Sequence, residues 1–146
     1  MFDRADERGD RVVDFFGARL TLPPEGRFAS VESIARYVDD VLAHYAVQER
    51  WPACGPLGVR ARRGLSAAHY EYGGGKSGAV IAVPDRHTTW ALREWVVLHE
   101  IAHHLCRADP PHGPDFVATF CDLAGAVMGP EAAYVLRVVY SQQGVR

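Results

Sequence analysis

The feature that most constrains this chain is an apolar segment with ionisable side chains at its centre. Residues 95–105 read WVVLHEIAHHL, which places three histidines and a glutamate among large apolar residues. A helix that is apolar on nearly every side is buried, and burying unpaired imidazoles and a carboxylate costs on the order of several kcal/mol. A bound metal ion would remove that cost. We therefore expect a helix over about 89–105, with Thr88 or Thr89 as its N-cap, built around a metal site.

The spacing of these polar residues matches a metal site on a helix. His99 and His103 are four residues apart, so both imidazoles lie on one face and can reach the same ion. Glu100 lies beside that ion, where its carboxylate can accept a proton from a water molecule that the metal activates. The HExxH pattern thus predicts Zn²⁺ bound by His99 and His103, with Glu100 as the catalytic base.

A catalytic zinc site needs a third protein ligand, and the chain after the helix offers candidates. The Pro-Pro pair at 110–111 ends the helix and turns the chain back, and His112 follows at once. Gly113 lets the backbone pass close to the turn. We favour His112 as the third ligand, and the alternative is an acidic residue of the next helix, Asp115 or Asp122.

Other polar residues near the motif have different expected roles. Asp115 would stabilise the N-terminus of its helix or support a zinc histidine through a hydrogen bond. Cys106 lies seven residues beyond His99, about 10 Å along the helix axis, so the two cannot share an ion on a straight helix. His104 points about 100° away from His103 and is not expected to be a ligand.

The rest of the chain indicates a small sheet and several helices. Residues 12–22 predict one bent strand or a short hairpin around Gly17. Apolar residues at helical spacing predict a helix over 31–47, capped by Ser30. We expect two strands of an antiparallel sheet at 65–72 and 79–83. Two helices follow, at 114–129 and 130–141. We expect an α+β fold: a small antiparallel sheet packed on an N-terminal helix and on a C-terminal three-helix segment that carries HExxH.

Composition and charge limit the class of protein. The length predicts a single domain over 1–146, with 1–10 as a loose charged terminus. A net charge of −2 at pH 7 argues against a nucleic-acid partner, and no apolar run is long enough to span a membrane. Irregularly spaced cysteines indicate reduced thiols and a cytoplasmic protein. They are Cys54, Cys106 and Cys121, and we expect the last two to be small buried residues.

The motif and its surroundings also resemble a known family. HEIAH followed by HGPDF, within Trp95 to Phe120, resembles the SprT-like zinc metallopeptidases, including the Spartan group. HEIAHHL with HGPDFVATFCDLAGAVMGPE is still more similar to a family of small actinobacterial metallohydrolases. The resemblance implies a zincin-like fold with an edge strand above the active helix, zinc ligands His99, His103 and His112, and Glu100 as base. The chain lacks the cysteine-rich ribbon and the basic charge of the SprT and Spartan pattern, so DNA-linked protein substrates are not expected.

Together these observations predict a zinc-dependent hydrolase that acts on peptides or proteins. The strand at 79–83 is expected to be an ordinary core strand, although as an edge strand it could hold an extended peptide by main-chain pairing. One further donor would stabilise the oxyanion, and its candidates are Tyr70, Tyr72, His87 and Tyr134. Two alternatives stay open. One is a metal-stabilised protein-binding module without catalysis, which a closed fourth coordination position would favour. The other is a hydrolase of a non-peptide amide or ester.

Overall fold

The computed structural model confirms the α+β class. It describes residues 12–15, 18–21, 28, 30–62, 68–72, 78–84, 93–108 and 110–143. In chain order the elements are β1 Val12–Phe15, β2 Ala18–Thr21, α2 Val31–Ala43, α3 Tyr45–Arg50, β3 Leu57–Arg62, β4 His69–Tyr72, β5 Ala79–Pro84, α4 Glu94–Leu105, α5 Pro114–Met128 and α6 Pro130–Gln142.

The first two strands form an antiparallel hairpin, which is one of the two forms predicted for this stretch. Val12 pairs with Thr21 and Phe15 with Ala18. The predicted turn residue, Gly17, lies outside the described residues, as does the terminal segment expected to be loose.

The main sheet has three strands in the order β3-β5-β4 and is mixed, not purely antiparallel. The β4–β5 pair is antiparallel, as predicted, with Tyr70 opposite Ile81. β3 runs parallel to β5, with Leu57 opposite Ala79, so the prediction of a wholly antiparallel sheet is wrong. The physical reason is that the chain passes from β3 to the far edge and returns between the two outer strands.

The central position of β5 accounts for its continuous apolar sequence. Ile81, Ala82 and Val83 are all fully buried, as expected for a strand covered on both faces. On the outer face Arg60 and His69 flank Ala82 in register, and long polar side chains of this kind cover apolar surface with their stems. Because β5 is paired on both sides, it is the core strand that the sequence favoured, and it offers no free edge for a peptide.

The N-terminal helix begins as predicted but ends earlier. Ser30 caps α2 and forms a capping box with Ser33, while Ile34 and Val38 are fully buried. The predicted helix over 31–47 is interrupted at His44, whose backbone is extended at ψ 134°. The imidazole Nδ1 of His44 accepts a hydrogen bond from the Ala46 N–H at 3.1 Å, and this bond starts the short helix α3.

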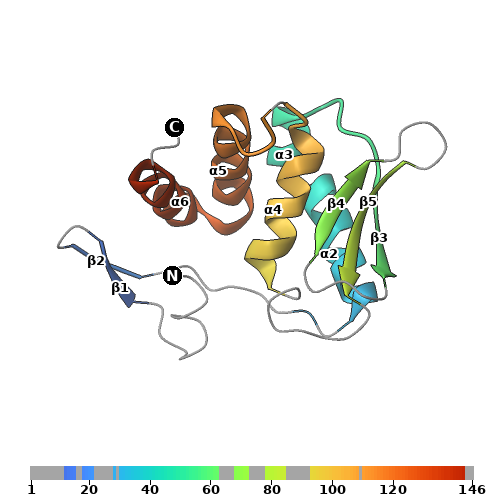
Figure 1. Cartoon of the computed structure of the whole chain (residues 1–146), viewed down its shortest axis with the longest axis horizontal. Helices are drawn as coiled ribbons and strands as arrows, with labels where there is room; N and C mark the ends of the chain where they lie inside the picture. The colour runs from blue at the N-terminus through green and yellow to red at the C-terminus, as the bar shows by residue number, and fades with distance from the viewer. Residues whose placement is uncertain are drawn as a thin grey trace.

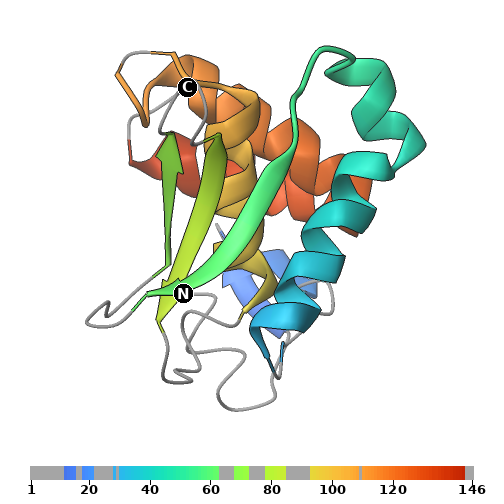
Figure 2. The ribbon, with the colours of Figure 1, turned by 90° about the vertical axis from the view of Figure 1, so that its right-hand side faces the viewer.

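Helices α2 and α4 lie on one face of the sheet, and α5 and α6 lie beyond α4 (Figure 1). The view in Figure 2 places the sheet in front of α4, α5 and α6, with α2 at the right beside β3. α4 is therefore the middle layer, which explains why most of its residues are buried. Its start differs from the prediction, because Arg93 is extended at ψ 145° and serves as the N-cap. Thr88 and Thr89 lie outside the described residues.

The last two helices follow the predicted boundaries closely. Pro114 is the first residue of α5 and Pro130 the first of α6. Gly129 connects them at φ 105°, a left-handed conformation that favours glycine. In the described part of the chain, no helix combines the length and apolar character needed to cross a membrane.

Candidate metal centre

Three imidazoles converge between α4 and the turn that follows it. His99 and His103 lie one turn apart on α4, and His112 lies in the turn before α5. One ring nitrogen of each residue lies within 4.8 Å of the corresponding nitrogens of the other two. The Nε2 atoms of His103 and His112 are 3.0 Å apart. The side chains predicted as metal ligands are thus close enough to hold one ion.

The turn that carries His112 depends on a close approach of backbone to a proline ring. The Gly113 N–H donates a hydrogen bond to the Pro110 carbonyl at 3.0 Å. A Cβ atom added at Gly113 would lie 2.9 Å from Pro110 Cγ and 3.2 Å from the Pro110 carbonyl oxygen. This crowding explains the glycine, and it confirms the close passage predicted at this position.

Substituting Gly113 by alanine is therefore expected to disturb the third ligand. Overpacking of this kind costs about 1–3 kcal/mol, and relief of the clash would shift the turn that bears His112. Urea unfolding should show this loss, and titration with zinc should show affinity weakened by about tenfold. Gly58→Ala is the matched control, because its added Cβ would meet no atom closer than 3.9 Å. Equal zinc affinities of the two variants would contradict this account of the turn.

An aromatic side chain of α5 supports all three imidazoles. The Phe116 ring is fully buried and lies 4.3 Å from His103, 5.0 Å from His112 and 5.1 Å from His99, measured between ring centroids. Phe120, one turn later, lies 5.6 Å from His99. This supporting wall was not predicted from the residue types. The signal for it is the aromatic residue two positions after Pro114, which faces α4 once α5 has started.

Glu100 is buried beside the histidines and is held from two sides. Its Oε1 accepts a hydrogen bond from the Tyr70 backbone N–H at 2.8 Å, and its Oε2 lies 2.6 Å from His99 Nδ1. Because a carboxylate oxygen accepts, His99 Nδ1 donates, and the lone pair of His99 Nε2 remains for a metal. The contact with Tyr70 also fixes Glu100 against the sheet, since Tyr70 belongs to β4.

The electrostatics of His103 favour the form that binds metal. The pKa of His103 is lowered to about 4, mainly by burial and then by the neighbouring His99, whereas the Glu100 carboxylate opposes the shift. His103 is therefore neutral at pH 7. Neutral imidazole is the form with a free lone pair, so this ligand needs no deprotonation before it coordinates.

His104 lies outside the group of three histidines that could hold an ion. Its Nε2 lies 2.7 Å from the Gly55 carbonyl, and its Nδ1 lies 3.1 Å from the Tyr70 hydroxyl. The carbonyl can only accept, so Nε2 carries the proton and Nδ1 accepts from Tyr70. Burial lowers the pKa of His104. Tyr70 therefore connects two residues of α4, through its N–H to Glu100 and through its hydroxyl to His104.

The remaining candidate ligands lie apart from the three histidines. Asp122 is 3.6 Å from Arg50 and 3.7 Å from Arg137. Asp115 is exposed in the first turn of α5. Among the described residues, the group that could hold an ion contains neither of them, nor Cys106. Cys121 is buried as predicted, and burial raises the pKa of its thiol, whereas Cys106 is only partly buried.

The candidate oxyanion donors are distributed unevenly. Tyr70 and Tyr72 line a hollow beside the metal ligands, and the Arg107 guanidinium lies over the Tyr72 ring at 4.0 Å. Tyr134 is 53% exposed on α6 and lines neither hollow that reaches the histidines. His87 lies outside the described residues.

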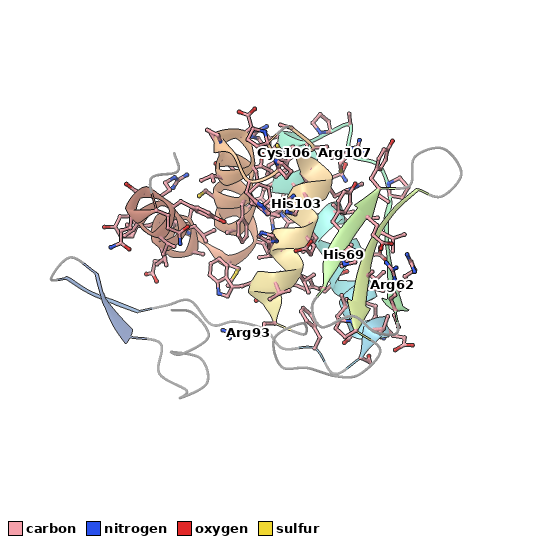
Figure 3. The ribbon with its side chains drawn as sticks, in the orientation of Figure 1. Arg62, His69, Arg93, His103, Cys106 and Arg107 are labelled. Carbon is pink, nitrogen blue, oxygen red and sulfur yellow. The ribbon has the colours of Figure 1, made fainter. Side chains whose placement is uncertain are left out.

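Two hollows of different chemistry meet at the base of the site. The first, of about 570 Å³, contains all three histidines and polar groups such as Tyr70 and Arg107. Figure 3 shows His103 within α4 and Arg107 beyond the upper end of that helix. The second, of about 410 Å³, is mainly apolar. Both are lined by Ala68, His99 and Glu100.

The fold brings together the four residues predicted from HExxH and the following turn, and it adds Tyr70 and Phe116 as their supports. A scan against protein-family models, a search of curated proteins and a search of solved structures all find no match.

Proposed function

We propose that this chain is a zinc-dependent hydrolase with a zincin-like active site, and that its substrates are peptides. The observation that carries the proposal is the convergence of three imidazole nitrogens within 4.8 Å beside a buried carboxylate that does not belong to the ligand set. A purely structural site does not require that carboxylate. A hydrolytic site does, because water must lose a proton as it attacks.

The donor set suits zinc. Two ligands of a tetrahedral zinc lie roughly 3.4 Å apart at a Zn–N distance of about 2.0–2.1 Å. The 3.0 Å between His103 Nε2 and His112 Nε2 is near that value, and the 4.8 Å upper limit requires only small side-chain rotations. Three protein ligands are the usual number in catalytic sites. Zinc would polarise the scissile carbonyl and lower the pKa of water toward ~7.

Two contacts of Glu100 support the proposal that it is the general base. The Tyr70 N–H holds Oε1, so the carboxylate plane is fixed against the sheet, and Oε2 is the oxygen that faces the ligand His99. To accept a proton, Oε2 exchanges its hydrogen bond with His99 Nδ1 for one with water. Because the carboxylate is buried, bulk solvent has little access to it. The exchange therefore involves water within the site.

The position of β4 favours an extended peptide over other amides or esters. β4 is an edge strand of the main sheet, and the Tyr70 N–H points away from β5 toward Glu100. In the described part of the chain no strand pairs with that edge. An extended peptide could add to it by main-chain hydrogen bonds, which would bring the peptide backbone beside the carboxylate.

The test is metal content followed by activity. We expect about one zinc per chain in protein purified without chelators, and cleavage within a fluorogenic peptide library that stops with EDTA and returns with zinc. His112→Ala should lose most of the zinc, whereas Asp115→Ala, which removes the alternative third ligand, should keep it. Protein that contains no zinc, and takes up none on titration, would remove the hypothesis.

One observation favours a second candidate, a metal-stabilised protein-binding module. Both oxygens of Glu100 are engaged, one by Tyr70 and one by His99, as for a carboxylate that only orients a metal ligand. In that case the metal would hold α4 and the following turn together, and the edge of β4 would bind a partner without cleaving it. The two candidates predict different consequences of removing the base.

A further inference from the structure

The apolar hollow beside the three histidines, which we call the recess, has a lining that the proposed metal site and Glu100 do not account for. One side consists of His99 and Glu100 themselves. The rest of the lining is Ala68, apolar side chains of α4, α5 and α6, and Gln143 just after α6, which is exposed. The apolar residues are Trp95, Val96, Phe120, Leu136, Val139 and Tyr140. The hollow is thus continuous with the site, although most of its lining comes from elements that carry no ligand.

Its size suits one bulky side chain. The hollow has a volume of about 410 Å³, and a cavity of about 150 Å³ with an apolar lining already holds a benzene molecule. The hollow is large enough for a substrate side chain of the size of leucine or phenylalanine, with the backbone atoms of the substrate at its opening. The ring of Tyr140 is partly buried, and burial raises the pKa of its hydroxyl, so the lining carries no negative charge there at neutral pH.

The two hollows differ in polarity, so the site has a polar side and an apolar side. The hollow beside β4 carries His69, Tyr70 and Arg107, whereas the second hollow is lined mainly by apolar side chains, apart from Gln143 and the shared His99 and Glu100. A substrate peptide that passes between β4 and the histidines would have polar groups on one side of its reacting carbonyl and the apolar recess on the other. Only the recess offers burial to a large apolar group.

We propose that this recess binds a bulky apolar side chain of the substrate next to the bond that is cleaved, and so determines which peptides are cut. This inference rests on the proposed function, because a cleaved bond requires the metal and Glu100. Val139 is the residue best placed to set the size of the recess. It lines the recess from α6, is only partly buried and is neither one of the three histidines nor the proposed base.

The experiment compares two zinc-binding probes by titration calorimetry on the zinc-loaded protein. Acetohydroxamate reports on the metal alone, and 3-phenylpropanohydroxamate adds a phenyl group that can enter the recess. We expect the phenyl compound to bind about 10–100-fold more tightly, the gain typical of burying one large apolar group. This readout does not depend on catalysis.

Two variants and their neighbours show whether the recess causes that preference. Val139→Trp should reduce it to less than about threefold, and so should Gln143→Trp at the exposed rim, which cannot disturb the core. Val138→Trp and Gln142→Trp are the matched controls, because neither residue lines the recess. The melting temperatures of the four variants show that each is folded.

Equal affinities of the two hydroxamates for the native protein would overturn the inference, as would a preference that survives both substitutions in the recess. If neither hydroxamate binds, the proposal that the zinc has an open coordination position is wrong. The recess would then be measured by itself, with 3-phenylpropanol titrated into metal-free protein and followed by the NMR signal of the Trp95 indole. The absence of a saturable shift there would overturn the recess as a binding site.

Discussion

Replacing Glu100 by glutamine is expected to lower turnover by about 10²–10⁴-fold while leaving the zinc in place. Glutamine keeps the size of the side chain and can still accept the Tyr70 N–H through its carbonyl oxygen, but it cannot take a proton from water. The magnitude is the usual contribution of a general base. Single-turnover and steady-state rates on a peptide that the native protein cleaves would measure it.

The same variant separates the two candidate functions. If Glu100 is the base, zinc content and melting temperature should stay within about one or two degrees of the native values. If Glu100 only orients His99, the substitution should weaken zinc binding and leave activity in proportion to loaded protein. Glu131→Gln, on the exposed start of α6, is the matched control. Cleavage by the Glu100 variant at an undiminished rate would show that the proposed mechanism is wrong.

Zinc is expected to raise the melting temperature by roughly 5–10 °C when free zinc is at about 100 times its dissociation constant. Mass action then contributes about 2.7 kcal/mol, and each kcal/mol corresponds to a few degrees for a chain of this size. An ion held by the three histidines would join α4 to the turn before α5, so it would bind only the folded arrangement. Differential scanning calorimetry with and without EDTA would measure the shift.

Variants on α4 and just beyond it test whether the three histidines cause that stabilisation. His103→Ala should abolish the rise, because two imidazoles bind zinc far more weakly than three. Cys106→Ala should keep it, since Cys106 lies outside the ligand group. A metal-free form that melts at the same temperature as the zinc-loaded form would show that the ion makes no contribution to the fold.

The part of the site that could be predicted from the sequence is the part built from neighbours along the chain. Helical spacing places His99 and His103 on one face. The prolines before His112 indicate where the chain turns back. The start of α5 at Pro114 is equally local. Each of these inferences needs only helix geometry and the restricted backbone of proline, and the structure agrees with each.

The parts that could not be predicted depend on distant segments. The contact between Tyr70 and Glu100 spans 30 positions, and that between His104 and Gly55 spans 49. The parallel pairing of β3 with β5 depends on the path of the chain between them, which periodicity does not specify. The apolar recess needs α6 to face α4. Residue types alone identified Tyr70 as a polar candidate but could not assign its backbone N–H to the carboxylate.

The three histidines lie close together in the sequence, whereas Glu100 is oriented by a contact with a distant segment. This difference affects the order in which the site forms during folding. The three imidazoles come from one segment of the chain, 99–112, so closing it costs little loop entropy. Glu100 is aimed only after β4 has docked on α4, a contact of high sequence separation that forms more slowly. On the proposed function, a chain that is still folding would be able to bind zinc before Glu100 is in position to act as the base.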